Sequence, residues 1–295
     1  MKGRPGRFDK GDDPINHAIW TETGDRSAMR RIPKVQHMEF TQAIGRFLKP
    51  LGLLPLARLL WAHLSRLSPM NIRHRREMRR FYAQFVRKGD LVFDVGANVG
   101  NRTEVFVKLG ARVVCVEPQE SCIRQLRKLF GNNDMVTIVD KALGESDGLS
   151  ELLVCEDANT ISTMSEKFTT DGPFADKYTW TRRQPVNVTT LDALVRQYGV
   201  PKFCKIDVEG YETHVIKGLS TPVPVISFEF HRELLEDTRI CMKSLSSLGQ
   251  VQFNCSSGES MKLLYESWMG PEELCTRLEA IVEDELWGDI YARFL

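Results

Sequence analysis

The sequence predicts an α/β protein in which helices cover both faces of a mostly parallel β-sheet. From residue 91 to residue 294, short apolar segments alternate with amphipathic segments of helical periodicity, a pattern typical of such sheets. A Gly-rich turn follows the first apolar segment, and folds of this class bind ligands beyond the carboxyl ends of their strands. With 295 residues, the chain is long enough for one large domain and an extension.

Each predicted element has a recognisable end. Pro118 stops the second strand, Gly110 and Gly131 close helices, and Thr190 can cap a helix that runs through Tyr198. The predicted strands span residues 91–95, 111–117, 135–139, 149–155, 203–207, 225–230, 250–254 and 289–294. The predicted helices span residues 72–86, 101–109, 119–130, 191–198, a short segment ending at 217, 238–247 and 271–283, and residues 156–185 are predicted to be a long surface loop or lid.

Composition and charge divide the chain into two parts. Hydrophobic residues make up 42% and charged residues 27%, which excludes a wholly disordered chain, a collagen and a small disulfide scaffold. Residues 1–90 contain 19 Lys and Arg against 8 Asp and Glu, whereas residues 91–295 contain 21 against 31. We therefore expect a basic N-terminal extension with short amphipathic helices at 1–70, and the main domain at 71–295.

The extension contains the most apolar stretch, residues 44–67, which is interrupted by prolines and arginines and is not expected to span a membrane. Residues 42–67 predict two short helices that pack on the main domain or lie on an anionic membrane. The basic run at 73–80 fits either reading, so the expected membrane contact covers residues 44–80. A nucleic-acid patch is the third alternative, and no nucleic-acid partner is expected.

The cysteines and the N-terminus favour a cytoplasmic protein. The seven cysteines include no CxxC pair, which is typical of reduced thiols, and no zinc-ligand spacing occurs. The first 20 residues lack the apolar core of a signal peptide.

The turn at residues 93–103, FDVGANVGNRT, is the strongest chemical signal. Gly96 and Gly100 would let the backbone approach a ligand where a Cβ would clash. Their GxxxG spacing differs from the GxGxxG of dinucleotide binders. Asp94 leads the turn and suits a cation better than a pyrophosphate. An NAD-type oxidoreductase, which shares the strand–helix alternation, is therefore the less favoured enzyme.

Two further acids follow the next strands. Glu117 ends the second strand, where an acid can accept hydrogen bonds from both hydroxyls of a ribose. Asp140 ends the third strand, just before Ala142, and is placed to meet an adenine amino group. Acids at three strand ends predict a cationic or neutral nucleoside such as S-adenosylmethionine. The alternative is an α/β protein with turn glycines and exposed acids but without this ligand.

Three segments together resemble the FkbM-type methyltransferase family: LVFDVGANVGNRTEVFVKLGARVVCVEPQ at 91–119, KIDVEGYE at 205–212 and SFEFH at 227–231. The resemblance covers roughly residues 75–295. It implies a class I methyltransferase (Rossmann-like) fold, with a seven-stranded sheet whose last strand is antiparallel, S-adenosylmethionine as cofactor, and methyl transfer to an oxygen of a sugar, glycolipid or other small acceptor. The cofactor residues that it implies are Asp94, Gly96, Asn98, Gly100, Glu117 and Asp207, to which the strand-end reading adds Asp140 and Ala142.

The predicted catalytic residues are His231, Asp207 and Glu209. Asp207, Glu209 and Glu212 crowd one strand end, where like charges can raise a carboxylate pKa. His231 ends the fifth strand and could take a hydroxyl proton at neutral pH. Alternatively, Glu209 and Glu212 mark a helix start, and His231 is a capping or surface residue.

The same segments narrow the reaction. IDVEG stands where a nucleic-acid amino methyltransferase would show an NPPY-like tetrad, which argues against base methylation. The clustered carboxylates permit a metal, but no spacing demands one. A non-catalytic nucleoside-binding or membrane-attached scaffold is the alternative outside the enzymes.

Overall fold

The computed structural model describes residues 69–282 and 286–295. The predicted helices within residues 42–67, and nearly all of the predicted N-terminal extension, lie outside the described residues. In the part that is described, no helix has the length and apolarity needed to cross a bilayer.

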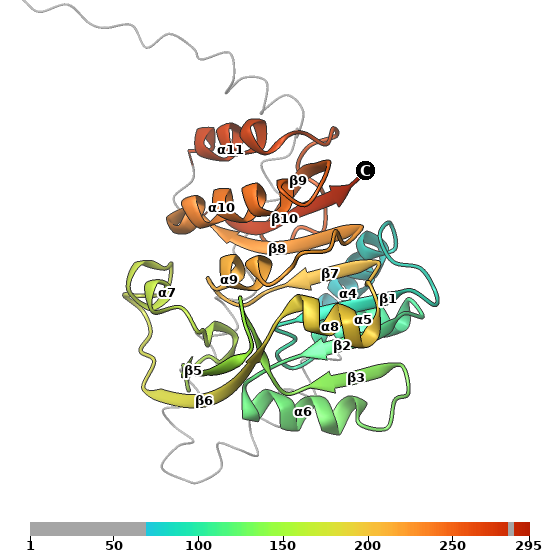
Figure 1. The fold of residues 1–295 in the computed structure, drawn as a ribbon, viewed down its shortest axis with the longest axis vertical. Helices are drawn as coiled ribbons and strands as arrows, with labels where there is room; N and C mark the ends of the chain where they lie inside the picture. The colour runs from blue at the N-terminus through green and yellow to red at the C-terminus, as the bar shows by residue number, and fades with distance from the viewer. Residues whose placement is uncertain (1–68, 283–285) are drawn as a thin grey trace, which may run out of the picture.

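A seven-stranded sheet forms the centre of the molecule, in the order β3-β2-β1-β7-β8-β10-β9 (Figure 1). β1 pairs in parallel with β2 and β7, while β10 runs antiparallel to both β8 and β9. This is the class I methyltransferase arrangement with its last strand reversed, as predicted. The strands are β1 (Leu91–Val95), β2 (Arg112–Val116), β3 (Val136–Val139), β7 (Phe203–Ile206), β8 (Val225–His231), β9 (Val251–Ser257) and β10 (Trp287–Phe294).

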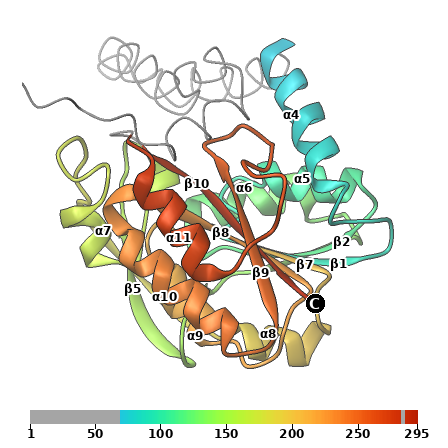
Figure 2. The same cartoon turned by 90° about the horizontal axis from the view of Figure 1, so that it is seen from above.

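Helices cover both faces of this sheet because its central strands are apolar on both sides. Phe93 and Ile206 point into one core, and Val92 and Phe203 point into the other. Figure 2 shows α4 and α5 on the opposite side of the sheet from α10. The first core includes residues of α8 (Leu191–Tyr198), α9 (Glu212–Lys217), α10 (Leu235–Ser246) and α11 (Pro271–Ala280), and the second includes residues of α4 (Pro69–Tyr82), α5 (Asn101–Lys108) and α6 (Glu120–Phe130).

α4 belongs to the main domain although it begins before residue 71. Tyr82 is fully buried, and its ring packs edge-on against Phe106 of α5 and Phe203 of β7. Arg75 forms an ion pair of 3.0 Å with Glu104. The helix ends at Tyr82 rather than at the predicted residue 86, and the segment after it continues the aromatic packing through Phe85, which stacks on Phe203.

A second, three-stranded sheet lies beside the carboxyl end of the main one and was only partly predicted. Its order is β4-β6-β5, and the segment at 149–155 belongs to it. The prediction that residues 156–185 form a long surface loop is wrong. The segment contains two short helices and the start of β6, and its residues Ile161 and Phe168 are buried. These elements are β4 (Ala142–Leu143), β5 (Gly148–Val154), η1 (Asn159–Ile161), α7 (Glu166–Asp171) and β6 (Arg182–Thr189).

All seven cysteines are buried and free of disulfides in the described structure. Burial raises the pKa of the Cys115 thiol and of the Cys204 thiol, so both stay protonated. They act as small apolar residues of the core.

Candidate functional site

A cavity of about 590 Å³ opens at the carboxyl ends of β1, β2 and β7. Its volume lies within the range of small-molecule and cofactor sites. The loops after these strands form one wall, and α4, β4 and the loop after β5 form the others. The predicted site residues that line the cavity are Asp94, Gly96, Asn98, Glu117, Ala142, Asp207 and Glu209.

The glycines of the turn after β1 are packed closely against other parts of the protein. Gly96 has φ 75°, and a Cβ there would lie 1.7 Å from the main-chain oxygen of Asp207. Gly100 has φ 82° and is not among the cavity-lining residues; a Cβ there would meet Phe130 and Leu126 at 2.6 and 2.8 Å. Both glycines therefore allow close packing within the protein, which fixes the turn against β7 and α6.

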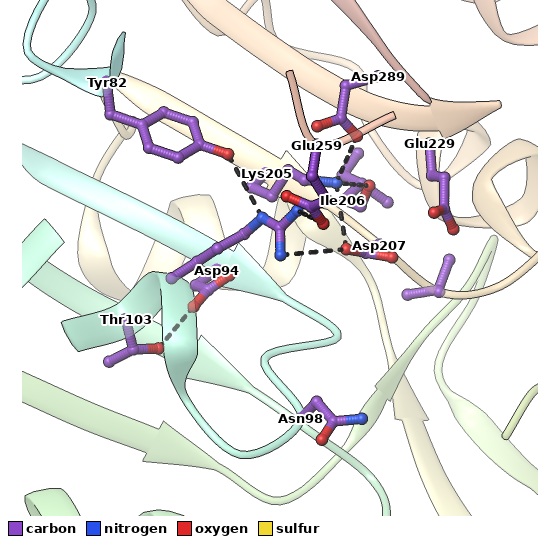
Figure 3. Close-up of polar contacts among 12 residues, drawn as sticks. Tyr82, Asp94, Asn98, Thr103, Lys205, Ile206, Asp207, Glu229, Glu259 and Asp289 are labelled. Carbon is purple, nitrogen blue, oxygen red and sulfur yellow. Dashed lines mark hydrogen bonds and ion pairs between the residues drawn. The ribbon is translucent and has the colours of Figure 1, made fainter. Parts of the chain in front are cut away.

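Asp94 links the same turn to helix α5 through a side-chain hydrogen bond. Its side chain is 1% exposed, and Oδ2 accepts a hydrogen bond of 2.5 Å from the Thr103 hydroxyl of α5 (Figure 3). Burial raises the pKa of Asp94, and the hydrogen bond from Thr103 acts in the opposite direction. This carboxyl group thus ties the end of β1 to the first turn of α5 and faces the cavity.

Two main-chain N–H groups hold the carboxyl group of Glu117. Oε2 accepts a hydrogen bond of 2.7 Å from the Asn98 N–H, and Oε1 accepts one of 2.8 Å from the Gln119 N–H. Burial raises the pKa of Glu117 to about 7, although these two hydrogen bonds lower it. The carboxyl group is held rigidly and lines the cavity, with oxygen lone pairs left for a ligand.

The prediction that Asp140 lines the same crevice is wrong. Its carboxylate forms an ion pair of 2.9 Å with Arg127 of α6, and both side chains are more than half exposed. The chain turns at this strand end, so the next residues, Lys141 and Ala142, line the cavity instead. The sequence pattern identified the correct strand end but not the direction of the side chain.

The loop after β5 closes over the cofactor turn. Asn98 has φ 50°, and its amide Nδ2 donates to the Asn159 carbonyl at 3.2 Å. In return, Asn159 Nδ2 donates to Asn98 Oδ1 at 3.0 Å. Thr163, also in this loop, donates to the main-chain oxygen of Glu209 at 2.7 Å. These contacts fix Asn159 and Thr163 against the turns after β1 and β7, where both line the cavity.

Asp207 lies at the centre of a charged network that the sequence did not reveal. Lys205, fully buried on β7, lies 2.8 Å from Asp289 and 3.3 Å from Asp207, and Figure 3 shows both carboxylates pointing toward it. Arg102 lies 4.0 Å from Asp207 and donates to Glu259 at 3.0 Å. Burial lowers the pKa of Lys205, but Asp207 and Asp289 outweigh it and raise the pKa above its ordinary value.

The sequence signals for this network are uneven. Lys205 stands inside the KIDVEGYE segment and Arg102 inside the Gly-rich turn, so the sequence motifs contain both residues. Glu259 comes from the loop after β9, and no motif marks it.

Glu209 and Glu212 take different roles in the turn after β7. Glu209 has φ 54°, a conformation uncommon outside glycine, and it lines the cavity. Glu212, the first residue of α9, instead accepts at Oε1 a hydrogen bond of 3.0 Å from the Val208 N–H in the preceding turn. Glu212 therefore marks a helix start, as the alternative prediction has it, whereas Glu209 lies at the cavity.

His231 does not line the cavity, contrary to the expectation for a proton acceptor there. It is 6% exposed, and its ring packs near Phe168 and parallel to Trp287. Burial lowers the pKa of His231, but Glu229 outweighs it and raises the pKa to about 9. An imidazole that is already protonated at neutral pH cannot take a proton from a hydroxyl group.

The strand order and the cavity beyond the strand ends define a class I methyltransferase fold. The chain belongs to the FkbM methyltransferase family, because the model of the Methyltransferase FkbM domain matches residues 94–249, more than half of the sequence. None of the curated proteins compared matches the chain.

Two solved structures show how remote the structural likenesses are. Precorrin-6y C5,15-methyltransferase from Geobacter metallireducens has a TM-score of 0.38 at 11% identity, covering 75% of this chain and 87% of its own. Fibrillarin from Aeropyrum pernix, solved with bound S-adenosyl-L-methionine, has a TM-score of 0.39 at 11% identity, covering 70% and 68%. Likenesses at this level carry no argument about function.

Proposed function

We propose that this methyltransferase uses S-adenosylmethionine and transfers its methyl group to a hydroxyl oxygen of a small-molecule or glycan acceptor. The observation that carries the proposal is the placement of Asp94 and Glu117. Both are buried, both end neighbouring parallel strands, and both line one cavity of about 590 Å³. Two carboxyl groups suit a nucleoside with a positive charge.

The residues present fit the cofactor. Glu117 would hold the ribose, because two main-chain N–H groups fix its carboxylate while it faces the cavity. Ala142 and Leu143 offer an apolar surface for the adenine. Asp207 and Asp94 would face the charged end. When bound, S-adenosylmethionine supplies an activated methyl group that a nucleophile displaces from sulfur.

The chain's own residues would then align the acceptor and manage its proton. Positioning and exclusion of water account for much of such a reaction. Asp207 is paired with Lys205 and Arg102, so it is best suited to orient charge rather than to accept a proton. Glu209 lines the cavity and is placed to hold or take the proton of the acceptor hydroxyl.

Calorimetry and a methyl-transfer screen test the proposal. We expect the wild-type chain to bind S-adenosylmethionine and S-adenosylhomocysteine but not NAD. Glu117→Ala should weaken cofactor binding by at least ~10-fold, since it removes a hydrogen-bonded charged partner. Preferential binding of NAD would instead support the oxidoreductase alternative.

A screen with radiolabelled methyl groups across glycans, glycolipids and small alcohols tests the acceptor class. Glu209→Gln should lower kcat by roughly 10²–10⁴-fold on the acceptor identified, with cofactor affinity unchanged. Cofactor binding without turnover on any acceptor would support the non-catalytic scaffold.

A further inference from the structure

Three side chains, one from the turn after β7 and two from strand β8, meet next to the cavity. Glu209 lies in the turn after β7, and Glu229 and His231 lie two residues apart on the same face of β8. One ligating atom from each residue lies within 4.8 Å of the other two. We call these three residues the Glu–Glu–His cluster.

The cluster is buried and has the donor atoms of a metal site. Glu209, Glu229 and His231 are 5%, 6% and 6% exposed. Nε2 of His231 makes no hydrogen bond with any described residue; Glu229 Oε2 lies 3.4 Å away, an ion-pair distance without hydrogen-bond geometry. The aromatic rings of Phe168 and Trp287 restrict its imidazole.

A further carboxyl group is buried beside the cluster. Glu212, itself 7% exposed, adds a third carboxyl group beside Glu229. The buried Lys205 and the partly exposed Arg102, which lie on neighbouring elements, form ion pairs with Asp207, Asp289 and Glu259. Burying several carboxylates against a single imidazole is costly unless they are paired or bind a cation.

We propose that Glu209, Glu229 and His231 bind a divalent transition-metal cation at the wall of the cavity. Bonds of about 2.1 Å place ligand atoms roughly 3–4 Å apart, so small rotations of the three side chains close the present spacing. The imidazole favours Mn²⁺ or Zn²⁺ over Mg²⁺ and Ca²⁺, which prefer oxygen ligands alone. The cation and a proton compete for His231, since only neutral imidazole coordinates a metal.

The position of Glu209 gives the cation a role, and this part rests on the proposed function. Of the three ligands, only Glu209 also lines the cavity, so open coordination positions would face the acceptor. A bound cation lowers the pKa of a coordinated hydroxyl group and stabilises the alkoxide. With the cation bound, Glu209 would act as a ligand instead of as the proton acceptor, and the acceptor hydroxyl would lose its proton to solvent.

Metal binding is tested directly, without a methyl-transfer assay. The full chain is treated with a chelator and titrated with Mn²⁺, with electron paramagnetic resonance measuring free Mn²⁺ and calorimetry repeating the titration with Zn²⁺. We expect one tight equivalent per chain. Glu229→Gln and His231→Gln should each weaken it by at least ~10-fold, whereas Glu259→Gln, a cavity acid outside the cluster, should not.

Crystals of the wild-type chain grown with Mn²⁺ provide a test that does not depend on how the variants fold. An anomalous peak between Glu209, Glu229 and His231 would support the proposal. Three outcomes would overturn the proposal. These are a wild-type chain that binds no stoichiometric Mn²⁺, an anomalous peak elsewhere, and folded Glu229→Gln and His231→Gln variants that bind Mn²⁺ as tightly as the wild type. Because S-adenosylmethionine binding is measured separately, the cation site can fail while the proposed function stands, and the reverse.

Discussion

At the scale of single residues, the protonation of Glu117 should control cofactor affinity. Burial raises its pKa to about 7, while ribose hydroxyls donate hydrogen bonds to the ionised form. Affinity for S-adenosylmethionine should therefore rise about tenfold from pH 6 to pH 8. Calorimetry across this range should show a flat, weaker profile for Glu117→Gln. A wild-type profile as flat as that of the variant contradicts this role of Glu117.

The same carboxyl group should make the protein less stable as pH rises, whereas its effect on cofactor affinity increases with pH. Burial raises its pKa from the ordinary value of 4.5 to about 7, so the native state holds the proton of Glu117 more tightly than the unfolded state does. The contribution to stability is present below pH 4.5 and is lost as pH rises through 7. In urea unfolding, the free energy of unfolding should fall less between pH 5 and pH 8 for Glu117→Gln than for the wild type.

Gly96 should be the least replaceable residue of the turn. An added Cβ would collide with the Asp207 main-chain oxygen, and φ 75° is itself unfavourable for alanine. We expect Gly96→Ala to lower the free energy of unfolding by about 2–5 kcal/mol. Gly148→Ala is the matched control, since nothing lies within 4 Å of its added Cβ. Equal effects of the two substitutions in urea unfolding would show that the turn tolerates a shift.

At the scale of elements, the sequence predicts the main sheet well because its central strands, such as β1 and β7, are buried on both faces. β1 begins and ends at the predicted residues, 91 and 95. β6 was missed because it begins with two arginines, because its sequence is largely polar, and because it contains Pro185, which is unfavourable inside a strand. The proline is tolerated because β4 pairs only with Val188 and Thr189, further along the strand.

The candidate site was predicted only where it depends on strand ends. Asp94 and Glu117 follow from the position of β1 and β2, which periodicity identifies. The Glu–Glu–His cluster joins residues about twenty positions apart, and the side-chain directions that bring them together are set by tertiary packing. Asp140 shows the same limit, since Arg127 draws its carboxylate away from the cavity.

The buried Lys205 connects two strands that are not neighbours in the sheet. It reaches from β7 across β8 to Asp289 of β10. Lys205→Met would leave the buried Asp289 and the partly exposed Asp207 without this cation and should lower the free energy of unfolding by about 3–5 kcal/mol. Adding Asp289→Asn should recover part of the loss. Urea denaturation of both variants measures this, and a loss under 1 kcal/mol from Lys205→Met would show that water replaces the ion pair.

At the scale of the whole molecule, the charge asymmetry favours an oriented approach to an anionic surface. Residues 1–90 carry the excess of basic side chains and residues 91–295 the excess of acidic ones. The described end of the basic part, α4, exposes Met70 and Ile72 beside a row of arginines. The exposed arginines of α4 are Arg73, Arg76, Arg79 and Arg80.

We propose that this face of α4 contributes to peripheral membrane binding through residues 44–80. The full chain should float with vesicles containing phosphatidylglycerol at low salt and dissociate as salt screens the interaction. Replacing the four exposed arginines of α4 with glutamine should weaken binding by about 1 kcal/mol per charge. The matched control replaces four exposed basic residues elsewhere: Arg124, Lys128, Lys177 and Lys202. Equal losses from the two sets would indicate nonspecific attraction, and no flotation at low salt would exclude the membrane as a partner.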